Sequence, residues 1–150
     1  MTKLQKVQEM EQSAFAGNWD KFKSFLADDV YFHCGNTAEF NGSQGVVDFM
    51  QTMMSKRLAL TDLQVRSAWE TDDAVIMEFS MQALRMSDNK HVTFPCLDIY
   101  RFGDGRKITD WRVYAIEPTH IHQVLTKPFD IAAVSHGQLE LAQRAAFFGP

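Results

Sequence analysis

The segment CLDIYRFGDGRKITDWRVYAI, residues 96–116, decides the fold because it has the pattern of two strands joined by a tight turn. The turn residues Asp104 to Arg106 separate two runs in which side chains alternate. In an extended strand, every second side chain from Cys96 to Phe102 points to the same side, and Asp98 is among them. The segment therefore predicts a β-hairpin with a carboxyl group among apolar neighbours.

Asp98 needs an explanation, because an unpaired charge among apolar groups destabilises a fold. One interpretation is structural: backbone donors, Arg101 or Arg112 satisfy the carboxylate. The other is functional: burial raises the pKa of the carboxyl group, so that it can transfer a proton near neutral pH. We favour the functional interpretation, since a carboxyl is a costly residue for a purely structural position.

Strands are also predicted ahead of this hairpin. From about Leu63 onward the apolar residues recur with a period of two, and turn-like clusters interrupt them. The predicted strands cover residues 63–69, 74–85, 91–102 and 107–116. The pattern indicates an antiparallel meander.

The N-terminal part has the period of amphipathic helices instead. The predicted elements are a helix over residues 4–17, a helix capped by Asn18 and ending near residues 28–29, a strand over residues 30–34, a loop over residues 35–42 and a helix capped by Ser43. Helices followed by a meander predict an α+β domain in which one face of the sheet covers the helices.

Size and composition exclude several classes of protein. With 150 residues, 45% of them hydrophobic, the chain has the size of one domain. The 15 basic and 19 acidic residues form no long block of like charge, so no nucleic-acid partner is expected. No signal peptide and no run of about 18 apolar residues is present, so we expect a cytoplasmic protein without a membrane partner. Two cysteines, Cys34 and Cys96, predict reduced thiols.

The string LDIYRFGDGRKITDWRVY, residues 97–114, resembles the last two strands of the NTF2-like superfamily. This superfamily includes nuclear transport factor, the ketosteroid isomerases, the limonene epoxide hydrolases and the SnoaL-like polyketide cyclases. ADDV at residues 27–30 and the element order resemble it too, over residues 1–117. The resemblance implies an NTF2-like cone of three N-terminal helices on a curved, mixed, mostly antiparallel sheet. Residues 118–150 would be a C-terminal extension with a final helix.

The resemblance also implies a function. The SnoaL-like cyclases keep an aspartate in the strand position of Asp98 as a general acid/base, and the ketosteroid isomerases place a protonated aspartate there. A cofactor-independent isomerase or cyclase of a small hydrophobic carbonyl metabolite, polyketide or terpenoid-like, is therefore expected. The alternative is a non-catalytic small-molecule-binding or dimerisation module, since counting from ADDV puts Cys34 at the isomerase base position and Met10 near its tyrosine. Epoxide hydrolysis is not expected, because those enzymes need an aspartate two positions after the strand tryptophan, and two positions after Trp111 this chain has Val113.

Further site residues are assigned by strand alternation and by the resemblance. Cys34 is expected to face the pocket, where a third hypothesis makes it a nucleophile, and His33 is the candidate if the register slips by one. The predicted pocket lining consists of Trp19, Phe32, Phe49, Met53, Phe79, Tyr100 and Trp111. No metal site is expected, and His120 and His122 are interpreted as surface residues. Apolar Leu97 and Ile99 on the other sheet face favour a homodimer.

Overall fold

The structure, a computed structural model, describes residues 1–35, 37–104 and 106–115. The chain divides into two units, Met1–Ile116 and Glu117–Pro150, and the description below concerns the first. The predicted C-terminal extension, its helix and the two histidines at 120 and 122 lie outside the described residues. None of the helices within the described ranges is long and apolar enough to cross a membrane.

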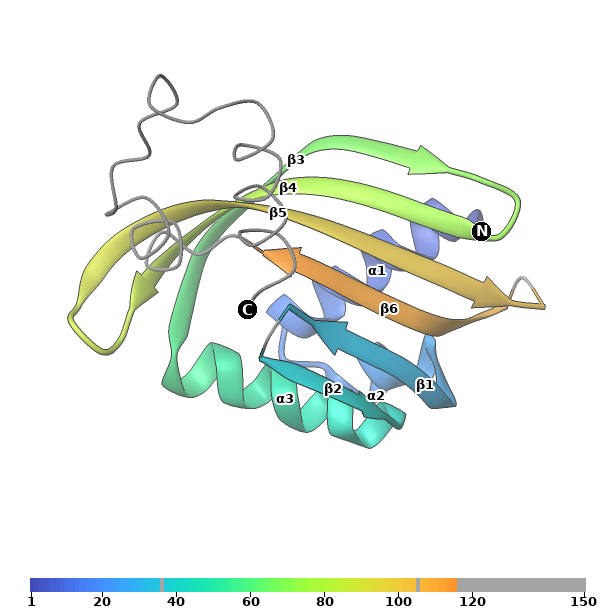
Figure 1. The fold of residues 1–150 in the computed structure, drawn as a ribbon, viewed down its shortest axis with the longest axis horizontal. Helices are drawn as coiled ribbons and strands as arrows, with labels where there is room; N and C mark the ends of the chain where they lie inside the picture. Colours follow the sequence, from blue (N-terminus) through green and yellow to red (C-terminus); the bar gives the residue numbers. More distant parts are fainter. Residues whose placement is uncertain (36, 105, 116–150) are drawn as a thin grey trace, which may run out of the picture. The chain divides into compact units, whose positions relative to one another are not determined.

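A single curved sheet organises the first unit (Figure 1). Its strands are β1 (Leu26–Cys34), β2 (Ala38–Asn41), β3 (Leu58–Glu70), β4 (Ala74–Arg85), β5 (Lys90–Gly103) and β6 (Lys107–Ala115). The strand order is β2-β1-β6-β5-β4-β3, and all neighbours are antiparallel except β1 and β6. The predicted meander and the mixed, mostly antiparallel sheet are confirmed.

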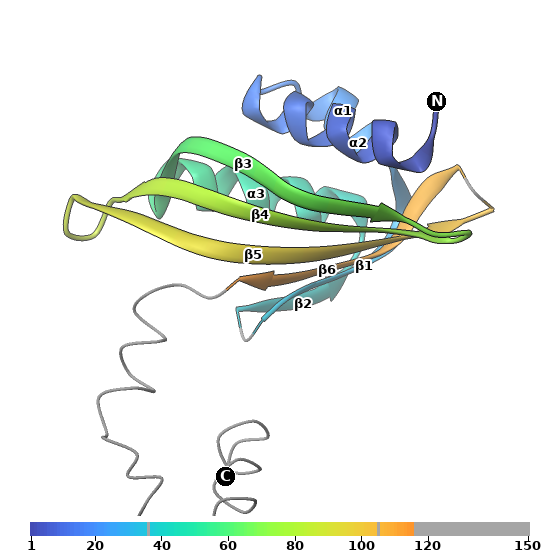
Figure 2. The same cartoon turned by 90° about the horizontal axis from the view of Figure 1, so that it is seen from above.

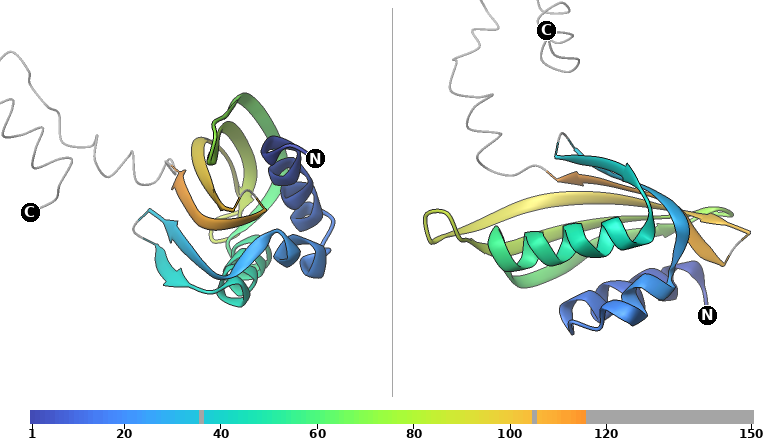
Figure 3. Two further views of the ribbon diagram at one scale, coloured as in Figure 1. Left: turned by 90° about the vertical axis from the view of Figure 1, so that its right-hand side faces the viewer. Right: turned by 90° about the horizontal axis from the view of Figure 1, so that it is seen from below.

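Three helices lie on one face of this sheet (Figures 2 and 3). They are α1 (Lys3–Phe15), α2 (Trp19–Ser24) and α3 (Ser43–Lys56). A capping box starts α1: the Thr2 hydroxyl accepts from Gln5 N at 3.1 Å, and Gln5 Oε1 accepts from Thr2 N at 2.8 Å. The Asn18 side chain accepts from Lys21 N at 3.2 Å, which confirms the predicted cap of α2. Within the described residues, the prediction of three N-terminal helices is confirmed only in part, because two helices are long and α2 has only six residues.

The boundary between α2 and β1 was predicted wrongly. The helix ends at Ser24 rather than near residues 28–29, and the strand starts at Leu26 rather than at residue 30. Leu26 lies opposite Ile108 of β6, and the two side chains are fully buried. Sheet pairing and burial of these apolar side chains outweigh the helical period of the sequence here.

Two other predictions next to β1 were also wrong. The segment 35–42, predicted as a loop, contains β2, which pairs antiparallel with β1. The residue that caps α3 is Gly42, with φ 114°, and no side chain accepts a hydrogen bond from the first turn. A positive φ of this size favours glycine. Ser43, the predicted cap, is the first residue of the helix and is buried.

Strand pairing sets side chains in rows across the face of the sheet that the helices cover, called here the inner face. The tryptophan row consists of Phe32, Trp111, Tyr100 and Val75, which oppose one another across β1, β6, β5 and β4. The aspartate row, one step along the strands, consists of Cys34, Val113, Asp98 and Met77. The tryptophan row is buried throughout, so it forms the centre of the core.

Candidate active site

Asp98 lies on the inner face in the middle of β5 and is 3% exposed. Its Oδ2 accepts a hydrogen bond from Trp111 Nε1 at 2.9 Å and lies 3.1 Å from the Tyr100 hydroxyl oxygen. Its Oδ1 accepts from the Cys96 thiol at 3.1 Å. All of these neighbours are uncharged groups, so the carboxyl is held in place without a cation.

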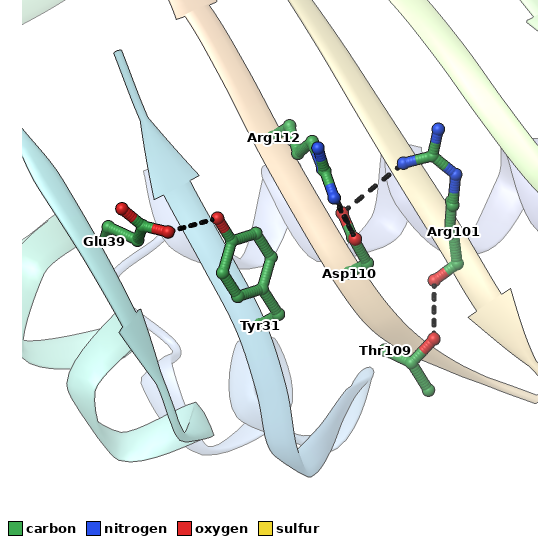
Figure 4. Close-up of polar contacts among 6 residues, drawn as sticks. All are labelled: Tyr31, Glu39, Arg101, Thr109, Asp110 and Arg112. Atoms are coloured by element: carbon green, nitrogen blue, oxygen red, sulfur yellow. Dashed lines mark hydrogen bonds and ion pairs between the residues drawn. The ribbon is translucent and has the colours of Figure 1, made fainter. Parts of the chain in front are cut away.

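Neither of the arginines considered as partners pairs with Asp98. Arg101 and Arg112 lie on the opposite, outer face, because side chains alternate along a strand. Arg112 Nη2 is 2.9 Å from Asp110 Oδ2, and Arg101 Nη1 is 3.6 Å from Asp110 Oδ1 (Figure 4). Arg112 also lies 5.3 Å from the centre of the Tyr31 ring. The interpretation of Asp98 as the partner of one of these guanidinium groups is wrong.

The environment of Asp98 raises the pKa of its carboxyl toward neutral pH. Burial raises the pKa of the carboxyl to about 6, although the hydrogen bonds from Cys96, Trp111 and Tyr100 act in the opposite direction. Desolvation disfavours the charged form, whereas donors stabilise it. A carboxyl with such a pKa is populated in both forms near pH 6, as a group that takes up and releases a proton requires.

Glu11 of α1 belongs to the same cluster. The Tyr100 hydroxyl oxygen lies 2.7 Å from Glu11 Oε1. Burial and then the negative charge of Asp98 raise the pKa of Glu11 to about 8, while the Tyr100 hydrogen bond lowers it. The sequence reasoning missed this residue. A signal was present, because Glu11 falls four residues after Val7 and three before Ala14 in the buried stripe of α1.

Cys34 lies in the aspartate row, two strands from Asp98, and is half-buried. Burial and then the charge of Asp98 raise the pKa of its thiol to about 11. The thiolate is the nucleophilic form of cysteine. The thiol therefore stays protonated near neutral pH, which opposes the hypothesis of a nucleophilic Cys34.

The structure does not bring His33 to Asp98. His33 opposes Arg112 on the outer face, and its ring centre is 6.2 Å from that of Tyr114. Its Nδ1 is buried and has no hydrogen-bond partner among the described residues. As expected from strand alternation, His33 and Cys34 face opposite sides, and Cys34 faces inward.

The residues predicted to line a pocket fall into two groups. Four are side chains of the inner face: Phe32, Phe79, Tyr100 and Trp111. The other three come from helices: Trp19 of α2, and Phe49 and Met53 of α3.

Contacts differ within the predicted lining. The ring of Trp111 is 5.2 Å from those of both Phe32 and Tyr100, and it stacks on Tyr100. Phe49 reaches the same cluster, 5.2 Å from Phe32. Trp19, in contrast, packs edge-on against Phe22 of the same helix, 5.5 Å away, and the ring of Phe22 lies 6.0 Å from that of Trp111. The part of the core next to Asp98 is thus formed by the rings of Phe32, Trp111 and Tyr100.

A family model of the SnoaL-like domain matches residues 7–111. No curated protein matches the sequence. Among solved structures, a protein from Catenulispora acidiphila with a ketosteroid isomerase-like fold, in complex with trimethylamine, is 15% identical with a TM-score of 0.65. The match covers 76% of this chain and 86% of that one.

Two further structures resemble the chain. A candidate polyketide cyclase from Xanthomonas campestris is 20% identical, with a TM-score of 0.62 over 74% of this chain and 87% of that one. An LEH-like epoxide hydrolase from M. tuberculosis is 18% identical, with a TM-score of 0.61 over 75% and 80%. At such identities the likeness establishes the fold, which is the NTF2-like fold predicted from the sequence, and hosts of this fold carry many chemistries.

Proposed function

The chain belongs to the SnoaL-like family, and we propose that it is a cofactor-independent isomerase or cyclase acting on a small hydrophobic carbonyl metabolite, polyketide or terpenoid-like. The observation that carries the proposal is the carboxyl of Asp98, buried on the inner face and bonded by uncharged groups alone. Asp98 would transfer a proton to or from a carbon beside the carbonyl or the enol oxygen.

The hydrogen bonds suggest different roles for the two carboxyl oxygens of Asp98. Oδ2 is fixed by Trp111 and Tyr100, whereas the donor to Oδ1 among the described residues is the Cys96 thiol, which is a weak donor. Oδ1 is therefore the oxygen that is freer to receive a proton from a substrate, whereas a proton that arrives through Tyr100 would join Oδ2. In an isomerisation, the proton that Asp98 removes from one carbon returns to another atom of the same molecule, so no proton is consumed.

The surroundings favour an uncharged substrate. Val113, which opposes Asp98 in the aspartate row, and Cys34, which opposes Val113, are half-buried and offer an apolar approach to the carboxyl. The groups that shift the pKa values of Asp98 and Glu11 include no cation among the described residues. A carboxylate or phosphate substrate would meet two acidic groups without compensation, so a neutral ketone or enol fits better.

Replacing Asp98 by Asn tests the proposal. The assay follows deuterium incorporation beside the carbonyl in a panel of small cyclic enones and β-diketones in heavy water. Asp98→Asn should slow exchange by about 100-fold or more, the usual contribution of a general acid/base. Asp110→Asn on the neighbouring strand is the matched control and should keep the rate. Exchange that is catalysed by the unmodified protein and unchanged in Asp98→Asn would refute the role.

A second candidate, a non-catalytic binding module, is favoured by one observation. Both oxygens of Asp98 already have internal hydrogen bonds, as a carboxyl that only stabilises the core would. This candidate predicts that a bound ketone protects Cys34 from alkylation without any deuterium exchange, whereas the enzyme shows both.

Dimerisation through the outer face belongs to the same proposal. Trp69, Leu97 and Tyr114 are 50%, 37% and 43% exposed, and Leu97 opposes Tyr114 across β5 and β6. Large exposed apolar side chains on one face are typical of an interface. A homodimer is therefore expected, and Leu97→Lys should convert it to a monomer in analytical ultracentrifugation. A monomeric unmodified protein would contradict the expectation.

A further inference from the structure

We propose that Glu11 is a positioning residue of this site: it holds a proton at neutral pH, donates it to Tyr100 in a hydrogen bond, and through Tyr100 supplies it to Asp98. The part of this inference that concerns turnover rests on the function proposed above. The protonation of Glu11 and its coupling to Asp98 do not, and they can be tested without a substrate.

The hydrogen-bond geometry around Tyr100 carries the inference. Its hydroxyl oxygen lies 2.7 Å from Glu11 Oε1 and 3.1 Å from Asp98 Oδ2. A phenol has one hydrogen to donate, so it serves only one carboxyl at a time. If both carboxyls were ionised, the Tyr100 oxygen and the carboxylate oxygen that does not receive its hydrogen would face each other with no hydrogen between them. One of the two carboxyls must therefore be protonated and donate to the phenol oxygen.

The remaining partners indicate that this carboxyl is Glu11. Asp98 accepts hydrogen bonds from Trp111 Nε1 and Cys96 Sγ, which stabilise its charged form. The hydrogen bond described for the Glu11 carboxyl is the one with Tyr100. The pKa values follow the same order, since burial raises that of Glu11 to about 8 and that of Asp98 to about 6.

The titratable groups around the pair do not change this assignment. Those that act on it come from β5 and β1, and all are acids: Cys34, Cys96 and Tyr100. On the flanking elements, Glu9 pairs with Lys21 of α2 at 2.6 Å, and Glu70 of β3 accepts from Leu4 N at 3.1 Å. The side chains of β4 that oppose Asp98 and Tyr100 are Met77 and Val75, which do not titrate.

The proton transfer is balanced. The Glu11 O–H bond breaks and its proton joins the Tyr100 oxygen, while the Tyr100 proton joins Asp98 Oδ2. Before and after the step one carboxylate and one carboxylic acid are present, so the net charge stays the same. Glu11 is half-buried, whereas Asp98 is 3% exposed. Glu11 is the less buried of the two residues, so in this proposal a proton from outside the site reaches Asp98 through Glu11 and Tyr100 rather than through a bound substrate.

The Trp111 indole N–H provides a readout, since it donates directly to Asp98. Its nitrogen and proton chemical shifts should follow the protonation of the pair in an NMR titration of the unmodified protein without ligand. We expect two steps, one near pH 6 from Asp98 and one near pH 8 from Glu11. In Glu11→Gln, whose amide still donates to Tyr100, the upper step should disappear. Glu9→Gln, on the same helix but paired with Lys21, should keep both steps.

A single step near pH 6 in the unmodified protein, or two steps that survive Glu11→Gln, would overturn the inference. If Glu11→Gln does not fold, the unmodified protein with labelled glutamate decides alone: one carboxyl carbon must titrate near pH 8 rather than near its ordinary value of 4.5. Tyr100→Phe keeps both carboxyls but removes the hydroxyl between them. Each carboxyl should still titrate, but the Glu11 step should no longer change the Trp111 signal above pH 7.

Turnover supplies the second arm. With the deuterium-exchange probes, Glu11→Gln should lower kcat with little change in KM and remove the alkaline limb near pH 8. A normal pH–rate profile in Glu11→Gln, with the NMR steps as expected, would refute the catalytic part only. If neither Asp98→Asn nor Glu11→Gln loses exchange activity, the proposed function is refuted. The NMR titration would still decide whether Glu11 holds a proton at neutral pH.

Discussion

Asp98 and Asp110 are two aspartates on neighbouring strands that face opposite sides of one sheet. Asp98, on the inner face, is bonded by an indole, a phenol and a thiol and is buried. Asp110, on the outer face, is bonded by the guanidinium groups of Arg112 and Arg101 (Figure 4). Asp110 raises the pKa of Arg112, so this guanidinium stays charged. The inner carboxyl, without a cation, has a pKa raised by burial.

The difference shows how a sheet separates two uses of the same side chain. Partners of opposite charge favour the ionised form of a carboxyl, and near solvent such pairs contribute little stability. Uncharged donors in a dry environment fix the geometry of a carboxyl but leave its proton exchangeable. The inner face therefore holds a buried carboxyl with a raised pKa, which the proposed proton transfer requires, whereas the outer face holds a charged pair that is partly exposed to solvent.

The largest expected difference between the faces concerns β6 itself. Trp111→Ala should lower the free energy of unfolding by about 3–5 kcal/mol, since it empties the centre of the core and removes a donor from Asp98. Tyr114→Ala, on the outer face and 43% exposed, should stay within about 0.5 kcal/mol when both variants are made in the Leu97→Lys background, where no dimer is expected. Chemical denaturation measures both, and similar losses would contradict the assignment of the faces.

Stability should depend on pH through the inner face. The pKa of Asp98 rises from 3.8 to about 6 and that of Glu11 from 4.5 to about 8 on folding, so between those values the folded chain holds protons that the unfolded chain releases. Stability is then greatest at low pH and falls as the pH rises from about 4 to 8. The Asp98 contribution, on the order of 3 kcal/mol, is lost between about pH 4 and 6, and the Glu11 contribution is lost up to about pH 8.

Denaturation midpoints across this range measure the effect. The double variant Asp98→Asn, Glu11→Gln should flatten the profile, whereas Asp110→Asn should leave its slope in place. Asp88 does not interfere, because Arg85 lowers its pKa to about 2 and its contribution changes only below this range. Stability that rises from pH 5 to pH 8 would contradict the raised pKa values.

Removing a single donor from Asp98 should have a smaller effect. Trp111→Phe keeps a ring against Phe32 and Tyr100 but deletes the indole N–H. We expect a loss of about 1–3 kcal/mol at pH 8, where the carboxylate is charged, and a smaller loss at pH 5. The pKa of Asp98 should rise further, since this hydrogen bond lowers it. A loss that is equal at both pH values would show that only packing was affected.

The smallest effect is expected on the outer face. Arg112→Gln removes the closer guanidinium of Asp110, but both side chains are partly exposed to solvent. The free energy of unfolding should change by less than about 1 kcal/mol, and less still at high salt. Denaturation at two salt concentrations measures this. A large loss that salt does not reduce would mean that the outer pair is covered, as in a tight dimer.

Local patterns allowed much of the fold to be predicted. The strict alternation in residues 74–85 and 91–102 correctly predicted β4 and most of β5, and the Asn18 cap was also correct. Predictions were wrong at the start of β1 and at β2, because residues 26–29 and 38–41 are extended only through pairing with other strands. Such pairing has no signature in the local sequence.

The candidate site divides in the same way. Alternation alone determined that Asp98, Tyr100 and Phe102 share a face and that His33 and Cys34 do not, because side chains in a strand point to opposite sides in turn. Only the tertiary structure decided that Glu11, 89 residues before Tyr100, and Asp98 both contact the Tyr100 hydroxyl. The same holds for Arg101 and Arg112, which pair with Asp110 and not with Asp98. The physical reason is that local geometry follows from the period of the chain, whereas the charge state of a buried carboxyl depends on groups that folding brings together from distant positions.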